Sequence, residues 1–257
     1  MKKPKLIFKY RAVSSPKEFD RLSDILKNQR LYLPTIPQLN DPFEGKINVS
    51  FGIPGSFIIR SKDNDFSPVK EAKAKTRLLA LSEDCFSPQL WAYYCNDYHG
   101  VCLCFKTDST FDSIKPVDYP EHRQIGNPVI EPSWNQIYQL LSNSLLTKQE
   151  GWKYEHEWRM IFQPQLDSED SITTESPSFL PFDSNELVGI ILGNKLSDSE
   201  KNDILAITPA HVNVFNVHTG ALTGKVKLEE YGYKYPGDGS KYDYISSVEE
   251  LNDRIMP

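Results

Sequence analysis

Residues 187–192, Leu-Val-Gly-Ile-Ile-Leu, form the best continuous apolar run of the chain and predict a central β-strand with both faces buried. Ser197 and Glu200 follow with the spacing of a capping box, which predicts a helix over 198–206. Residues 212–217 then alternate apolar and polar side chains, as a half-buried strand does. The C-terminal third of the chain therefore reads as strand, helix and strand.

Upstream of this run, strands and helices are mixed without the regular alternation of a parallel α/β sheet. Short apolar runs predict the strands, and apolar spacing with Ser-Pro starts predicts the helices. The strands are 6–10, 31–33, 78–82, 101–106 and 157–162, and the helices are 16–28, 88–96 and 132–148. Residues 117–119 are expected to pair with strand 101–106, and residues 164–178 to form a loop.

The predicted fold class is α+β, with a mainly antiparallel sheet flanked by helices in a single domain. A split sheet is a variant of this prediction. Residues 1–195 are expected to form the main α+β domain, and residues 196–257 a C-terminal extension packed on it.

Composition bounds the class of protein. The chain has 257 residues, 39% hydrophobic and 12% aromatic, which is too apolar and aromatic for a disordered protein. The net charge is −6. An acidic balance removes the simplest electrostatic case for binding duplex DNA or an anionic membrane.

Targeting signals and metal-binding cysteine pairs are not evident. Only three apolar residues follow the basic start before Lys9, too few for a signal peptide, and no run approaches the ~20 apolar residues of a membrane span. The four cysteines contain no Cys-x-x-Cys pair, so they are expected to be buried free thiols without metal. We therefore expect a cytoplasmic protein with no membrane partner.

The first candidate motif is Lys9-Tyr10-Arg11, at the end of the first strand. In a strand, Lys9 and Arg11 share one face and Tyr10 takes the other. An Arg at a strand end suits bidentate binding of a phosphate or carboxylate. The alternative is an edge strand that carries charges to prevent aggregation.

The second motif is Asn40-Asp41-Pro42-Phe43-Glu44. Asp before Pro favours an extended or turn conformation, and Asn40 can close an Asx turn. The motif is then a structural turn with Phe43 in the core. The alternative is that its carboxylates bind metal, although Asp41 lies only three positions before Glu44, which is too close for the usual two-strand nuclease arrangement.

The third motif is residues 152–159, Trp-Lys-Tyr-Glu-His-Glu-Trp-Arg. In a strand, Glu155, Glu157 and Arg159 lie on one face, and the two carboxylates are about 7 Å apart. Arg159 can offset their repulsion, which is a structural interpretation. The functional interpretation is acid–base work, or stabilisation of a developing cation.

Together these segments resemble a bacterial domain-of-unknown-function family, number 2971, over roughly residues 8–195. Tyr93 departs from the family pattern, in which His is expected. The segments that carry the resemblance are Lys9–Arg11, Asn40–Glu44, Leu79–Ser82, Trp91–Tyr94, Asn96–Cys102 and Trp152–Arg159.

At the level of fold, the order of Arg11, Ser82 and Glu157 is similar to that of ADP-ribosyltransferases, with Glu155 completing a Glu-x-Glu pair. This resemblance implies NAD as substrate and an unknown protein or nucleic-acid acceptor, in defence or toxin biology. It implies that Arg11 holds the pyrophosphate, Ser82 orients the nicotinamide ribose, Glu157 stabilises the oxocarbenium ion and Glu155 activates the acceptor. The further residues assigned to the NAD site are Tyr10, Asn40, Asp41, Trp91 and Tyr94, with Trp91 or Tyr94 stacking on nicotinamide.

Two other classes of function remain open. One is a metal-dependent nuclease that uses Asp41, Glu44 and Glu157 with Mg²⁺. The other is a non-catalytic binding module in which the motifs are structural. Convergence of Arg11, Ser82 and Glu157 on one cleft would favour NAD chemistry, whereas Asp41 and Glu157 meeting around one point would favour metal.

Overall fold

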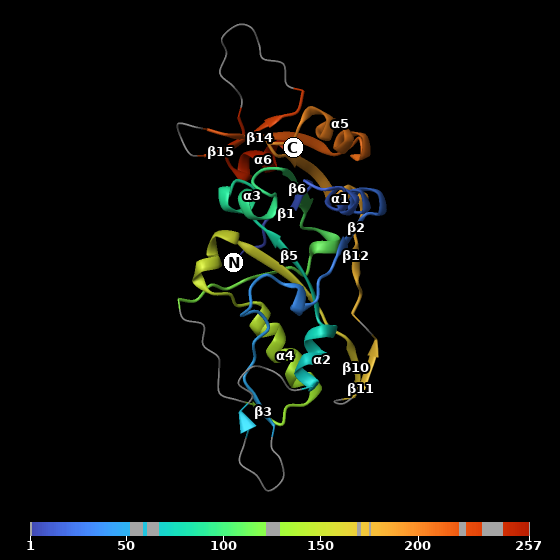
Figure 1. Ribbon diagram of the computed structural model, residues 1–257, viewed down its shortest axis with the longest axis vertical. Coiled ribbons are helices and arrows are strands. Elements are labelled where there is room, and N and C mark those ends of the chain that lie inside the picture. The colour runs from blue at the N-terminus through green and yellow to red at the C-terminus, as the bar shows by residue number, and fades with distance from the viewer. Residues whose placement is uncertain are drawn as a thin grey trace.

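The computed structural model describes residues 2–51, 59–60, 67–121, 129–168, 171–174, 176–220, 225–232 and 244–256. The main sheet is built from β1 (Leu6–Ala12), β5 (Arg77–Ser82), β6 (Gly100–Lys106), β7 (Lys115–Pro116), β9 (Glu157–Phe162), β13 (Leu187–Leu192), β14 (Asn213–Thr219) and β15 (Val226–Glu230). The order across this sheet is β15-β14-β13-β6-β1-β5-β9-β7. Figure 1 shows the chain elongated, with β14 and β15 toward one end.

The sheet is mixed but mostly antiparallel, which confirms the predicted α+β class with a mainly antiparallel sheet. Within this sheet, as far as the structure describes it, β13 and β14 are the only neighbours that pair in parallel, and the crossover helix α5 (Asp198–Ile207) joins them. The split-sheet variant is wrong, because hydrogen-bonded neighbours connect all eight strands. The predicted boundary at residue 195 stays a prediction, and β14 and β15 beyond it are strands of the same sheet.

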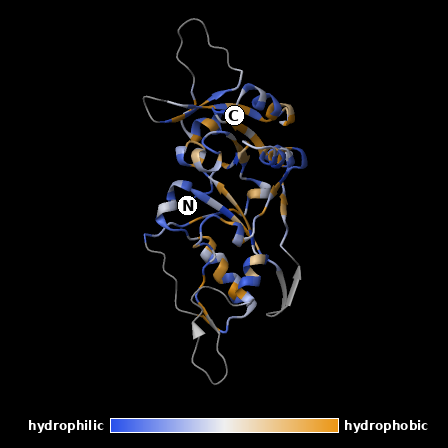
Figure 2. Cartoon of the chain, in the orientation of Figure 1, coloured by the Kyte–Doolittle hydropathy of each residue, from blue (hydrophilic) through white to orange (hydrophobic). Residues whose placement is uncertain are grey.

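The apolar run at 187–192 forms β13, which lies between β6 and β14 and has all six residues buried. Helices cover the sheet on both faces. Side chains of α1 (Pro16–Asn28) and α5 join one apolar core, and those of α3 (Pro88–Tyr94) and α6 (Val248–Ile255) join a second. A third core joins α2 (Ser67–Lys75) and α4 (Trp134–Leu145) to β5. Figure 2 shows hydrophobic residues concentrated on the central strands and on α4.

Shorter elements complete the described chain. Four 3-10 helices are η1 (Ile36–Gln38), η2 (Ser109–Phe111), η3 (Glu150–Glu155) and η4 (Ser184–Glu186). The short strands are β2 (Arg30–Tyr32), β3 (Val49–Phe51), β4 (Ile59–Arg60), β8 (Val129–Ile130), β10 (Gln165–Ser168), β11 (Ser171–Thr174) and β12 (Phe179–Pro181). They form three small sheets, β10-β11, β12-β2 and β4-β3-β8.

Two local predictions are wrong. Residues 164–178, predicted as a loop, contain the antiparallel pair β10–β11. The segment near Val117 pairs with β9 and not with strand 101–106, because β7 places Pro116 opposite Trp158 and Val117 N–H donates to Glu157 O. The four cysteines are free and buried, as expected. Among the described helices, none combines the length and the apolar character needed to cross a bilayer.

The junction of β1 and β5 is the feature that positions the candidate site. β1 pairs with β6 at every residue from Leu6 to Ala12, so it is an interior strand. Its described pairing with β5, in contrast, is limited to Phe8 opposite Ser82. Beyond this pair the two strands diverge, and the end of β1 that carries Lys9 and Arg11 borders a cavity and not a hydrogen-bonded neighbour.

Candidate functional site

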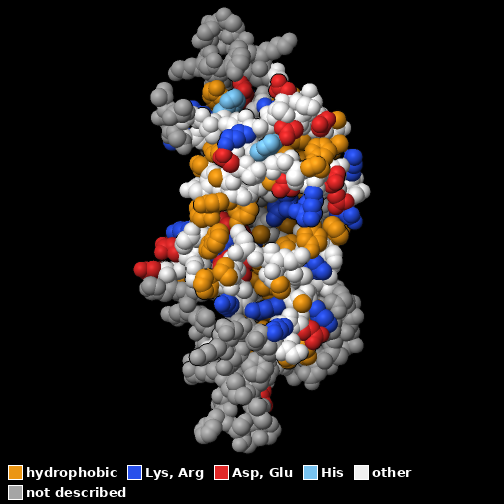
Figure 3. Space-filling model, viewed as in Figure 1, with side chains coloured by type: hydrophobic (Ala, Val, Ile, Leu, Met, Phe, Trp, Pro, Cys, Tyr) orange, Lys and Arg blue, Asp and Glu red, His pale blue; other side chains and the backbone are white. Residues whose placement is uncertain are grey.

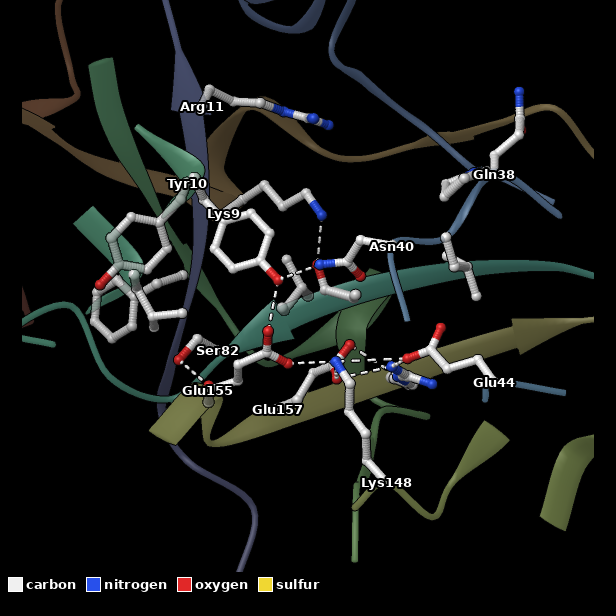
Figure 4. A pocket seen from close by; sticks show the side chains of 18 residues that line it. Lys9, Tyr10, Arg11, Gln38, Asn40, Glu44, Ser82, Lys148, Glu155 and Glu157 are labelled. Carbon is white, nitrogen blue, oxygen red and sulfur yellow. Dashed lines mark hydrogen bonds and ion pairs between the residues drawn. The ribbon is translucent and has the colours of Figure 1, made fainter. Parts of the chain in front are cut away.

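A cavity of about 320 Å³ lies where β1 diverges from β5. Figure 3 shows the surface hollowed near the middle of the long axis, with Lys and Arg side chains beside the hollow. Seven charged side chains line the cavity, and Figure 4 labels all of them except Arg159: Lys9, Arg11, Glu44, Lys148, Glu155, Glu157 and Arg159. All of them except Lys9 and Arg11 are buried, and such a concentration of buried charge is unusual in a protein interior and marks a candidate functional site.

The two glutamates of the Glu-x-Glu pair lie in different elements, one in a 3-10 helix and one in a strand. Glu155 is the last residue of η3, His156 is left-handed with φ 45°, and β9 begins at Glu157. The expectation that Glu155, Glu157 and Arg159 lie along one strand face is therefore wrong for Glu155. All three side chains nevertheless line the same cavity, because the left-handed residue turns the chain between the two carboxylates.

Arg159 binds two carboxylates in the interior. Its Nε donates to Glu157 Oε1 and its Nη2 to Glu157 Oε2, both at 2.8 Å, so this pair is bidentate. Nη2 also donates to Glu44, and Nη1 donates to Leu145 O at 2.7 Å. Glu44, from the Asp-Pro-Phe-Glu motif, thus contributes to the site from a segment far away in sequence.

Lys148 is the second cation of the cluster, and its role was not predicted from the sequence. Its Nζ lies 2.5 Å from Glu155 Oε2, 3.3 Å from Glu157 Oε2 and 3.5 Å from Glu44 Oε1. The ammonium also lies 4.6 Å from the centre of the Trp152 ring, within range of a cation–π contact. Only 2% of the Lys148 side chain is exposed, so these partners replace its hydration shell.

The two carboxylates of the Glu-x-Glu pair differ in their pKa. Burial raises the pKa of Glu155, although Lys148 acts to lower it. Burial also acts to raise the pKa of Glu157, but Arg159 and Lys148 outweigh it and lower that pKa. Environments that separate the pKa values of neighbouring carboxyl groups are typical of acid–base sites.

Glu155 is held by a chain of polar contacts. Tyr94 OH donates to Glu155 Oε1 at 2.5 Å and accepts from Asn40 Nδ2 at 2.9 Å. Burial, followed by the charge of Glu155, raises the pKa of Tyr94, so its hydroxyl stays a donor. Ser82 Oγ donates to the backbone oxygen of Glu155 at 2.7 Å. Three residues predicted for the site therefore hold Glu155: Ser82 holds its backbone, and Tyr94, oriented by Asn40, holds its carboxylate.

The cations of β1 lie across the cavity from the carboxylates (Figure 4). Because β1 is paired along its length with β6 and also meets β5, the edge-strand interpretation of Lys9-Tyr10-Arg11 is wrong. Lys9 Nζ donates to Ala80 O at 2.5 Å. Arg11 has a buried Nε without a hydrogen-bond partner, and no described carboxylate forms an ion pair with its guanidinium.

Three other predicted residues take different places. Tyr10 lines the cavity, and its hydroxyl donates to Asp84 O at 2.8 Å. Asp41 is buried next to the site and accepts from Phe43 N at 2.9 Å, without lining the cavity. The structure does not bring Trp91 to the cavity either: it is fully buried in the core, where it stacks on Tyr98. Stacking of Trp91 on nicotinamide is therefore wrong as a prediction.

The arrangement gives no support to the metal hypothesis. Among the residues that the structure describes, no group of three His, Cys, Asp or Glu side chains has the placement of a metal site. The space between Glu44, Glu155 and Glu157, where a cation would bind, is filled by the ammonium of Lys148. The protein thus supplies its own cation for these carboxylates.

The segment from α3 to β9 contains most of these residues. Residues 90–160 match a family model. Its description is Protein of unknown function (DUF2971), and the chain is similar to that family over this segment. The DUF2971 match includes Tyr94, Lys148, Glu155, Glu157 and Arg159. No curated protein and no solved structure matches the chain.

Proposed function

We propose that this protein is an NAD-dependent enzyme of the ADP-ribosyltransferase type, with its site in the cavity between β1 and β9. The observation that supports this most is that one cavity has a cation on one wall and two carboxylates on the opposite wall. Arg11 offers a guanidinium whose buried Nε has no hydrogen-bond partner in the described part of the chain, and Glu155 and Glu157 lie across from it with separated pKa values. A substrate with an anionic diphosphate next to a ribose can place the diphosphate at Arg11 and the ribose at the two carboxylates.

The chemistry follows from the charges. Arg11 binds the pyrophosphate through its guanidinium, whose Nε–H has no partner among the described residues. Nicotinamide leaves with the electron pair of the glycosidic C–N bond, and the ribose becomes an oxocarbenium ion. Glu157 remains ionised because Arg159 and Lys148 lower its pKa, and it stabilises this positive charge. The acceptor is water or a nucleophilic group of an unknown protein or nucleic acid.

Glu155 is the better proton acceptor of the pair. Burial raises its pKa, so its carboxylate is the more basic one and takes the proton from the attacking nucleophile. Ser82 and Tyr94 hold this carboxyl group in place through Glu155 O and Oε1. The implied role of Ser82 toward the ribose is thereby changed to a role in positioning Glu155.

The cavity is large enough for part of such a substrate. About 320 Å³ is at the lower end of small-molecule sites, which span roughly 300–1,000 Å³. The cavity therefore accommodates the nicotinamide riboside portion, and the remaining nucleotide extends past Arg11.

The test is release of nicotinamide from NAD, with water, cell-extract protein and single-stranded nucleic acid each supplied as acceptor. Glu157→Gln is expected to reduce the rate about 10²–10³-fold, the usual effect of losing one stabilising group. Glu249→Gln, at an exposed position of α6, is the matched control and should retain full activity. The proposal fails if the wild type releases no nicotinamide with any acceptor, or if Glu157→Gln is as active as the wild type.

A further inference from the structure

Two lysines line the cavity in opposite electrostatic settings: Lys148, which is buried, and Lys9, which is partly buried. Lys148 Nζ meets the carboxylates of Glu155, Glu157 and Glu44 within 3.5 Å. Lys9 Nζ has one hydrogen bond, to the carbonyl oxygen of Ala80, and no ion pair within the described part of the chain. A buried ammonium has three donors to satisfy, whereas a neutral amine is satisfied with fewer partners.

The surroundings of Lys9 favour the neutral amine. Burial, followed by the charge of Arg11 on the same strand face, lowers the pKa of Lys9 to about 7, despite the opposing effect of Glu157. In Lys148 the carboxylates outweigh burial and raise the pKa. Desolvation beside a second cation is the setting that activates lysine as a nucleophile.

We propose that Lys9 is a reactive amine that forms a reversible imine with the open-chain aldehyde of a ribose bound in the cavity. This inference rests on the proposed function, which generates ADP-ribose by transfer to water. The side chain enters the cavity from β1, between Arg11 and the two carboxylates (Figure 4). An anion held at Arg11 therefore lies next to the amine.

The step balances without a further reactant. The amine nitrogen adds to the aldehyde carbon, and the carbonyl π electrons move to oxygen. Proton transfers, for which Glu155 offers the more basic carboxylate of the pair, convert this adduct into a carbinolamine. Loss of water then gives the protonated imine, and hydrolysis regenerates lysine and aldehyde. No oxidant or reductant takes part.

The experiment traps the imine in the wild-type protein. The full chain is incubated at pH 7 with ADP-ribose and sodium cyanoborohydride, which reduces the imine to a stable secondary amine, and modified lysines are mapped by peptide mass spectrometry. Lys9 is expected to carry at least tenfold more adduct than any other lysine. A lysine with a pKa near 7 holds about 10³-fold more free amine at this pH than an ordinary lysine.

Matched variants fix the site of labelling. Lys9→Met should lose the dominant adduct, whereas Lys17→Met on the exposed side of α1 should keep it. Because the mapping is done on the wild type, a folding defect in Lys9→Met leaves the main result intact. Labelling of Lys9 no greater than that of Lys17, or no adduct at Lys9, overturns the inference.

Failure of this inference and failure of the proposed function are distinguishable. ADP-ribose is supplied directly, so trapping does not depend on NAD cleavage. Nicotinamide release without a Lys9 adduct overturns the imine step and leaves the proposed function standing. A Lys9 adduct without nicotinamide release supports the reactive amine and counts against NAD as the substrate.

Discussion

The ammonium of Lys148 lies 2.5 Å from Glu155 Oε2, and both side chains are almost completely buried. This contact joins the segment after α4 to the end of η3. With Arg159 it places two cations against the carboxylates of Glu44, Glu155 and Glu157, so the cluster keeps one excess negative charge if all five groups are ionised. That excess is oriented toward the cavity in which a positive transition state is proposed to form.

Lys148→Met is expected to destabilise the protein by about 3–5 kcal/mol, because it leaves buried carboxylates without their cation. The free energy of unfolding in urea measures this loss. Without Lys148 the pKa values of Glu155 and Glu157 in the folded state rise. The folded variant is therefore more stable when these groups are protonated than when they are ionised. Its deficit relative to the wild type therefore widens as the pH increases from 4 to 7.

Lys17→Met, at an exposed position, is the control for this substitution. Its free energy of unfolding should lie within about 0.5 kcal/mol of the wild-type value. A Lys148→Met protein as stable as the wild type at pH 7 would contradict the view that Lys148 compensates the cluster.

Much of the fold was predictable because its elements carry local signals. The Ser-Pro start and the apolar spacing place helix 16–28 where α1 lies, and the apolar run at 187–192 coincides with β13. The pair β10–β11 was missed because residues 165–174 are mostly polar and lack alternating apolar side chains. The pairing of β7 with β9 was missed because two residues carry no signal for a distant partner.

The candidate site was predictable where a motif carries several polar residues, as at Glu155–Arg159 and Lys9–Arg11. Lys148 was missed because a single lysine after a helical pattern looks like an ordinary exposed residue at a helix end. Its burial is decided by three carboxylates from other segments. The one signal in the sequence was a charge imbalance: the motifs supply more carboxylates than Arg159 alone can neutralise, so a second cation was required.

Lys9 should make the stability of the folded protein increase with pH. Its pKa of about 7 in the folded state lies below that of an unfolded lysine, near 10.4. Between these values the unfolded chain binds more protons, so the contribution of Lys9 to folding becomes more favourable as pH rises. Lys9→Met removes this contribution, and its stability relative to the wild type should fall by about 1 kcal/mol per unit from pH 7 to 9.

The comparison of Lys9→Met with the wild type, by urea unfolding at each pH, also removes a competing effect. Burial raises the pKa of the four cysteines, which opposes stability at high pH in both proteins alike. A difference between the two proteins that stays constant from pH 7 to 9 would show that Lys9 is already protonated throughout this range.

Gly100 fixes the distance between β6 and the end of β1 that carries Arg11. A Cβ at Gly100 would lie 2.3 Å from Arg11 O and 3.0 Å from Ala12 Cα. Gly100→Ala is therefore expected to cost about 1–3 kcal/mol and to weaken binding of ADP, as measured by calorimetry, because the strand must move. Gly151→Ala is the matched control, since a Cβ there meets nothing within 4 Å. Equal behaviour of the two variants would contradict this account.

Tyr94→Phe is expected to shift the pH dependence of nicotinamide release. The hydroxyl donates to Glu155 Oε1 at 2.5 Å and favours the ionised carboxylate. Without this hydrogen bond to a charged group, worth about 1.5 kcal/mol, the pKa of Glu155 rises and the acidic limb of the profile moves to higher pH by about one unit. Tyr93→Phe is the control, because Tyr93 is 70% exposed and outside the cavity lining. A lower rate for Tyr94→Phe with an unmoved acidic limb would show that Tyr94 supports the structure of the site without setting the protonation of Glu155.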